Sequence, residues 1–138
     1  MTGSPKVLLD ASAVLAYLLK QAGDATVEQV LPVSAISSVN LTEVLYKARE
    51  RGYKDDLTGL HHLLLRTGLN VVDVTEADAV QAAELITESR ANAKTGGSTL
   101  SLGDGVCIAV ATRLKLILVG DDRHWETLDL PVDYQPFR

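Results

Sequence analysis

The stretch Val7-Leu8-Leu9-Asp10-Ala11-Ser12-Ala13 decides how the rest of the sequence is interpreted. Its three consecutive apolar residues are typical of a short strand. From Ala11 to Lys20 the apolar residues recur at helical spacing, so a helix is expected directly after the strand. Asp10 therefore stands at the carboxyl end of a predicted strand, which is where ligands bind in open parallel sheets.

The same alternation of short apolar runs and longer amphipathic segments continues to the end of the chain. We expect further strands at 33–36, 69–74, 116–119 and 132–134. Expected helices cover 24–31, 37 or 38 to about 51, 55 or 56 to about 67, 75 to about 90, and 101–113, with a short one around Trp125. Residues 92–99 read as a loop. This order predicts one α/β domain over residues 1–138, with a largely parallel central sheet of about four to five strands and helices on both faces.

The composition excludes several classes of protein. With 13 Lys and Arg against 18 Asp and Glu, the formal net charge of −5 argues against binding nucleic acid by net charge alone. The single Cys107 excludes an internal disulfide framework and a cysteine-based zinc site, and it suits a reducing compartment such as the cytoplasm. We expect this thiol to be a small buried core residue. Neither a secretory signal nor a transmembrane segment is predicted.

The positions of the acidic residues are more informative than their number. Asp10 follows one strand directly, and the pair Asp121-Asp122 follows another. Glu43 lies in the first half of a helix, and Asp104 lies in the first turn of a strongly apolar one. Each position also has an ordinary explanation, as a helix cap, a solvated residue or turn chemistry. Taken together, the four segments are able to deliver carboxylates to one rim of the sheet.

A carboxylate cluster favours metal chemistry. Clustered carboxylates raise one another's pKa, and a divalent cation removes that cost. A ligand set made of oxygen atoms favours Mg²⁺ or Mn²⁺. Such a site suits phosphodiester hydrolysis, because the cation polarises the phosphoryl oxygen and lowers the pKa of an attacking water molecule. The sequence leaves open whether one or two ions bind.

At this point the sequence resembles a known family, the PIN-domain ribonucleases, and more narrowly the VapC-type toxins of toxin–antitoxin pairs. Four segments carry the resemblance, in the family's order: 7–13, 37–44, 101–109 and 118–125. The resemblance implies that Asp10 and Asp104 hold the principal metal ion and that Glu43 and Asp122 complete its shell. It also implies a Mg²⁺-dependent endoribonuclease, a cognate antitoxin that inhibits it, and a homodimer.

The resemblance leaves some residue roles open. Family members more often carry Thr or Ser two residues before the last acid, where this chain has Gly120, so Asp121 remains an alternative to the preferred Asp122. Ser12 is a candidate for contacting bound water or phosphate, with a helix-start role as its alternative. Asn40, one helical turn before Glu43, is a candidate for orienting that carboxylate.

The sequence gives weaker indications of which residues contact RNA, and it is also compatible with functions other than RNA cleavage. Trp125 is expected in the core rather than stacked on a base. The alternatives are a haloacid-dehalogenase-like phosphatase, a receiver-like phosphoacceptor, and a catalytically inactive PIN domain that only binds a partner. Six basic residues are candidates for phosphate contacts, with an ordinary solvent-exposed role as the alternative for each: Arg49, Arg51, Arg90, Lys94, Arg113 and Arg123.

Overall fold

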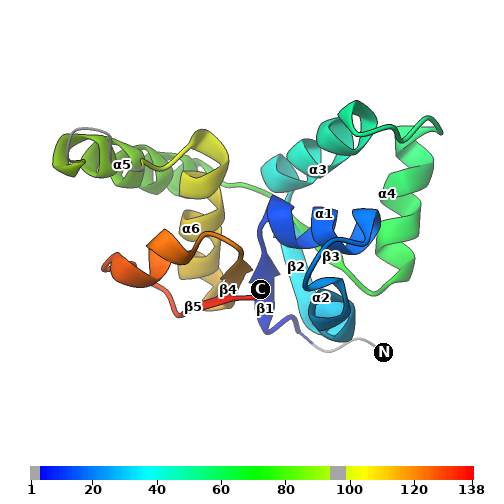
Figure 1. Ribbon diagram of the computed structural model, residues 1–138. Coiled ribbons are helices and arrows are strands. Elements are labelled where there is room, and N and C mark those ends of the chain that lie inside the picture. The colour runs from blue at the N-terminus through cyan, green and yellow to red at the C-terminus, as the bar shows by residue number, and fades with distance from the viewer. Residues whose placement is uncertain (1–3, 94–98) are drawn as a thin grey trace.

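The computed structural model describes residues 4–93 and 99–138, and these form a parallel sheet covered by helices (Figure 1). The sheet has five strands in the order β3-β2-β1-β4-β5, and every neighbouring pair runs parallel. The predicted α/β fold with helices on both faces is confirmed. The strands are β1 (Val7–Leu9), β2 (Ser34–Ser37), β3 (Asn70–Val72), β4 (Ile117–Gly120) and β5 (Tyr134–Pro136).

The helices begin where the sequence places capping side chains. Ser37, Asp56, Thr75 and Ser101 each accept a hydrogen bond from the backbone of the helix they precede, and Thr75 and Ser101 belong to complete capping boxes. The α-helices are α1 (Ala11–Leu19), α2 (Asp24–Val30), α3 (Ser38–Glu50), α4 (Leu57–Arg66), α5 (Glu76–Asn92) and α6 (Leu102–Leu114), and two 3₁₀ segments are η1 (Leu31–Val33) and η2 (Arg123–Thr127).

Two hydrophobic cores lie on opposite faces of the sheet. Val7 and Leu9 point into the core under α1 to α4, whereas Leu8 points into the core under α5 and α6. This alternation follows from the pleat of a strand, and it explains why β1 is apolar at every position. Figure 1 shows α5 and α6 on one side of the sheet and α1 to α4 on the other.

The structure corrects some of the predicted boundaries. The last strand is β5, at Tyr134–Pro136 rather than 132–134, because it pairs with β4 from Leu118 to Gly120. As an edge strand it accommodates Pro136, which has no N–H to donate. β2 and β4 each begin one residue later than expected, and β3 is shorter. The expected loop begins after Asn92, which still belongs to α5, and its residues 94–98 lie outside the described residues.

Two predictions about single side chains are confirmed. Cys107 is fully buried in α6, where burial raises its thiol pKa, so it is a core residue and not a reactive thiol. Trp125 is also buried, with its ring centroid 5.2 Å from that of Tyr134. Over the described ranges, none of the helices combines the length and the apolar character needed to cross a membrane.

Candidate functional site

Asp10 stands where β1 ends and α1 begins, and its carboxyl group caps the helix. Its Oδ1 accepts hydrogen bonds from the Ser12 hydroxyl at 2.6 Å and from the Ala13 N–H at 2.9 Å, which makes it the N-cap of α1. Its backbone N–H donates to the Val119 carbonyl at 3.0 Å, tying the end of β1 to β4. Oδ2 has no hydrogen-bond partner among the residues described, so one oxygen of Asp10 is anchored and the other is free.

Asp104 is also held at a helix start, as the third residue of α6, whose N-cap is Ser101. The Ser101 N–H donates to Asp104 Oδ2 at 2.9 Å, and the Asp104 N–H donates to the Ser101 hydroxyl at 3.2 Å. This is a capping box, which holds the first turn of the helix and the aspartate rotamer at once. The Oδ1 atom of Asp104 remains without a partner in the described part of the chain.

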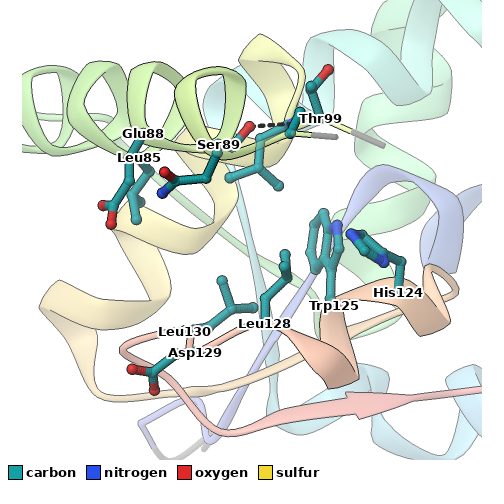
Figure 2. Close-up of a pocket in the computed structure, with 12 residues that line it drawn as sticks. Leu85, Glu88, Ser89, Thr99, His124, Trp125, Leu128, Asp129 and Leu130 are labelled. Carbon is teal, nitrogen blue, oxygen red and sulfur yellow. Dashed lines mark hydrogen bonds between the residues drawn. The ribbon is translucent and has the colours of Figure 1, made fainter. Parts of the chain in front are cut away.

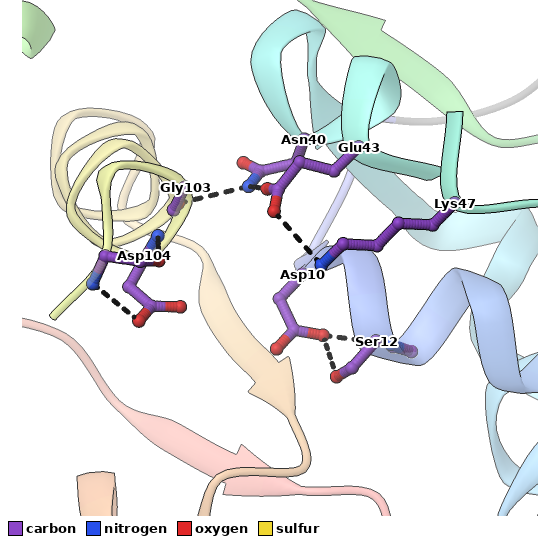
Figure 3. Close-up of polar contacts among 9 residues, drawn as sticks. Asp10, Ser12, Asn40, Glu43, Lys47, Gly103 and Asp104 are labelled. Carbon is purple, nitrogen blue, oxygen red and sulfur yellow. Dashed lines mark hydrogen bonds and ion pairs between the residues drawn. The ribbon is translucent and has the colours of Figure 1, made fainter. Parts of the chain in front are cut away.

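Glu43 is placed by Asn40, as the sequence predicts. The buried Asn40 amide donates to Glu43 Oε1 at 2.8 Å and to the Gly103 carbonyl at 3.1 Å, so one side chain ties α3 to the first turn of α6 (Figure 3). The Ser37 hydroxyl donates to Oδ1 of the Asn40 side chain and so sets the orientation of the side-chain amide. A Cβ at residue 103 would collide with the Glu43 carboxylate, so Gly103 is required for this close approach.

The two aspartates after β4 have different partners. Asp122 is the N-cap of η2, and its Oδ1 accepts from the His124 N–H at 3.0 Å. Asp121 instead forms an ion pair with Arg138, whose Nη2 lies 2.6 Å from Oδ2. A carboxylate already paired with a guanidinium is a poor candidate ligand, so the geometry favours Asp122 as the fourth acid.

We call Asp10, Glu43, Asp104 and Asp122 the acid cluster. Figure 3 shows the carboxyl groups of three of them, from β1, α3 and α6, turned toward a common region. The three aspartates all hold helix N-termini, yet each uses one carboxylate oxygen for that role. Capping and ligand binding are therefore compatible here, because the helix anchors the side chain and leaves the second oxygen available.

Burial and mutual repulsion act strongly on the acid cluster. Burial, together with the negative charges of Asp121 and Asp104, raises the pKa of Asp10 to about 7, although the hydrogen bonds from Ser12 and Ala13 oppose this shift. The pKa of Asp104 is also raised, by burial and by the charges of Glu43 and Asp122. These carboxylates lie close enough to oppose one another's ionisation, and a bound cation would relieve that repulsion.

The donor set fits a hard divalent cation. All the candidate ligands are carboxylate oxygens, which favour Mg²⁺ or Mn²⁺. Within residues 4–93 and 99–138, however, no three ligand-type side chains are grouped as tightly as one ion requires. The oxygens of Asp10 and Asp104 that have no internal partner would be the first to hold such an ion.

Lys47 is a residue at the site that the sequence analysis missed. Its ammonium group lies 3.6 Å from Glu43 Oε2, and Figure 3 shows the side chain extending from α3 toward the carboxylates. The pair is spaced i, i+4 on one helix, a pattern that is visible in the sequence. Lys47 supplies part of the positive charge that balances the acid cluster.

Several basic residues proposed for phosphate contact have internal partners instead. Arg113 pairs with the buried Asp78, with Nε 2.9 Å from Oδ1. Arg49 donates to carbonyl groups of the loop after α3, and Arg123 donates to the Arg138 carbonyl. Of the three, Arg113 has a buried charged partner, whereas Arg49 and Arg123 remain exposed. Arg51 and Arg90 are exposed, and Lys94 lies outside the described residues.

A separate pocket of about 510 Å³ lies between α5 and the η2 segment (Figure 2). Its walls are mainly apolar, with Leu85 on one side and Trp125 and Leu128 on the other, and His124 also contributes to the lining. None of the acid cluster lines this pocket. It is therefore distinct from the carboxylate site, although Trp125 follows Asp122 closely in the chain.

Comparisons with known proteins agree on the fold. A family model described as the PIN domain matches residues 7–130. VapBC2 from Rickettsia felis, bound to a promoter DNA fragment, is similar at a TM-score of 0.70 and 18% identity over 94% of this chain and 97% of the other. VapC20 from Mycobacterium tuberculosis, a sarcin–ricin loop cleaving toxin, is similar at a TM-score of 0.70 and 18% identity, over 90% of this chain and 95% of the other. DNA-bound VapBC from Salmonella typhimurium is similar at a TM-score of 0.67 and 17% identity, over 97% of this chain and 99% of the other. Curated protein sequences give no significant match.

Proposed function

The chain belongs to the PIN domain family, and from this premise we propose that it is a Mg²⁺-dependent endoribonuclease, with Mn²⁺ as a substitute ion. One observation carries the proposal. Asp10, Glu43 and Asp104 are far apart in sequence, yet the fold turns their carboxyl groups toward a common region, where Asn40 ties Glu43 to the residue before Asp104 (Figure 3). A fold that holds such a repulsive arrangement at the carboxyl ends of its strands is suited to binding a divalent cation there.

Each residue of the acid cluster has a separate task in this proposal. Asp10 and Asp104 hold the principal cation through their free oxygens, while Ser12 and Ser101 keep the opposite oxygens in place. Glu43, oriented by Asn40, and Asp122 complete the shell directly or through water. One carboxylate accepts the proton of the attacking water molecule. A cation bound there supplies an electrophile for the phosphate and stabilises the leaving oxygen.

The biological setting belongs to the same proposal. The solved structures that resemble this chain include toxin–antitoxin complexes, which supports a cognate antitoxin that binds the protein and inhibits it. We propose a toxin that acts on RNA in the cytoplasm and forms a homodimer. An inactive PIN domain and a phosphatase are the competing functions. The observed strand order β3-β2-β1-β4-β5 differs from the 2-1-3-4-5 order of receiver domains, which argues against a receiver-like phosphoacceptor.

A cleavage assay with matched variants tests the enzymatic proposal. The purified protein is incubated with structured and single-stranded RNA in Mg²⁺, in Mn²⁺, and in a chelator. Cleavage is expected with either ion and not with the chelator. Asp104→Asn is expected to lower the rate on the order of a hundredfold or more, because several kcal/mol of charge stabilisation depend on the cation. Asp55→Asn, the same change at an exposed acid outside the cluster, is the control.

The outcomes separate the competing functions. Release of phosphate from a small phosphate ester, with RNA left intact, would indicate a phosphatase. Inactivity on both substrates, in a protein that still folds, would favour the partner-binding alternative. Co-purification with the product of the adjacent gene tests the antitoxin, and light scattering over a range of concentrations tests the homodimer. A monomer at high concentration would contradict the latter.

A further inference from the structure

The hydroxyl group of Tyr134 is an unexplained polar group beside the acid cluster. Tyr134 lies in the edge strand β5, opposite Leu118 of β4, and its ring packs against Trp125. The hydroxyl oxygen is buried and has no hydrogen-bond partner in the described part of the chain, where no other buried side-chain oxygen or nitrogen is left without one. The backbone N–H of Asp122 lies close enough to lower the pKa of Tyr134, but it can only donate to the oxygen, so the O–H group itself still has no acceptor. Such a group requires an explanation, because leaving a buried polar atom unpaired costs stability.

The hydroxyl lies near the free oxygen of Asp10. A Cβ placed on Gly120 would collide with Asp10 Oδ2 and would lie 3.2 Å from the Tyr134 hydroxyl, so both oxygens border the same space above Gly120. Ser12 and Ala13 already hold Oδ1, whereas Oδ2 has no partner among the described residues. A phenol donates a hydrogen bond and a carboxylate oxygen accepts one, so the two unsatisfied groups are complementary.

The phenol keeps its proton in these surroundings. Burial raises the pKa of Tyr134 above its usual range, and the negative charges of Asp10, Asp122 and Asp121 raise it further. Gly120 contributes by having no side chain, because any larger residue would separate Tyr134 from Asp10. The tyrosine is thus a neutral donor beside the acid cluster, on a strand that supplies none of its members.

We propose that Tyr134 is a positioning residue of the cation site, and that its hydroxyl donates to the Asp10 carboxylate when a divalent cation is bound. This inference rests on the proposed function. The hydrogen bond from Tyr134 would hold Oδ2 of Asp10, while Ser12 and Ala13 hold Oδ1, so both carboxylate oxygens would be fixed. Partners of ligating carboxylates typically account for about 10–100-fold in metal affinity.

The role has a distinctive energetic signature. In the cation-free protein the hydroxyl is unsatisfied, so its removal is expected to leave stability unchanged or to raise it. In the cation-loaded protein the same removal takes away a hydrogen bond. A hydroxyl with a purely structural role would behave differently, because its loss would destabilise the cation-free protein.

The test is Tyr134→Phe, with Tyr46→Phe at an exposed position of α3 as the matched control. Mn²⁺ affinity is measured by titration calorimetry and by electron paramagnetic resonance, and thermal unfolding is measured in a chelator and in excess Mn²⁺. We expect Tyr134→Phe to weaken Mn²⁺ binding at least about tenfold. Its unfolding temperature in the chelator should equal or exceed that of the unmodified protein, and Tyr46→Phe should change neither quantity.

Unchanged Mn²⁺ affinity in Tyr134→Phe would overturn the inference, as would a lower unfolding temperature in the chelator. Asp10→Asn separates this failure from that of the proposed function. If the unmodified protein binds Mn²⁺ and Asp10→Asn abolishes binding while Tyr134→Phe does not weaken it, only the role of Tyr134 is wrong. If the unmodified protein binds no Mn²⁺ at all, both proposals are wrong.

Discussion

Gly120 lies directly against the carboxyl group of Asp10, and a methyl group on residue 120 would collide with Asp10 Oδ2. The two residues come from the ends of adjacent parallel strands, and the Asp10 N–H donates to the carbonyl of the residue before Gly120. The backbone of β4 therefore forms one wall of the space that receives the catalytic candidate Asp10.

Gly120→Ala is expected to push the Asp10 carboxylate out of its place. Overpacking of this kind typically costs about 1–3 kcal/mol of stability, and displacing Oδ2 should also weaken Mn²⁺ binding. Urea unfolding and calorimetric titration measure the two effects. The control is Gly59→Ala in α4, where a Cβ meets nothing within 4 Å. That change should raise helix stability by at most about 1 kcal/mol, and equal behaviour of the two variants would contradict the prediction.

The stability of the cation-free protein should fall as the pH rises. Burial raises the pKa of Asp10 from 3.8 to about 7, so between these values the folded protein binds more protons than the unfolded chain. The unfolding free energy must then decrease through this range, and the raised pKa of Asp104 acts in the same direction. Urea unfolding in a chelator at a series of pH values measures the slope.

Asp10→Asn provides the check on that slope, because it removes the main titrating group. The variant should lose much of the pH dependence, and excess Mg²⁺ should reduce it in the unmodified protein. A stability that rises between pH 4 and 7 in the chelator would count against the assignment to Asp10.

Removing the charge of Lys47 should strengthen cation binding. The ammonium group lies 3.6 Å from Glu43 Oε2 and reduces the negative potential of the acid cluster. Lys47→Met is expected to raise Mn²⁺ affinity about two- to fivefold at low ionic strength, with a smaller gain at high salt because the exposed charge is screened. Lys54→Met, an exposed lysine in the loop before α4, is the control. Weaker binding by Lys47→Met would show that the lysine has another role.

The ion pair between Asp78 and Arg113 should affect stability alone. Asp78 is buried at the start of α5, and although burial raises its pKa, the hydrogen bonds from Arg113 and Thr75 lower it below its usual value. Asp78→Asn is expected to cost about 2–3 kcal/mol, because it leaves the guanidinium without its charged partner. RNA cleavage at temperatures where the variant is folded should be unchanged. A selective loss of cleavage would indicate that Arg113 contributes to substrate binding after all.

The sequence by itself determined the order of the helices and strands, apart from some boundaries, the order of the acids, and Asn40 as a candidate partner of Glu43. These features depend on interactions within a few residues. Ser101 and Asp104 form their capping box locally, and Asn40 reaches Glu43 within one helical turn. Short-range hydrogen bonds and apolar periodicity can be predicted from a sequence because the backbone geometry of a helix or strand is known in advance.

Only the tertiary structure decided which side chains meet across the sheet. The ion pair between Asp121 and Arg138, which lies at the far end of the chain, adds a tertiary reason for the preference for Asp122 already drawn from the sequence. The burial of Asp78, the partner of Arg113, depends on the packing of α5 against α6. The register of β5 places the Tyr134 hydroxyl near Asp10. Contacts between residues distant in sequence are set by strand register and packing, which a local pattern does not encode.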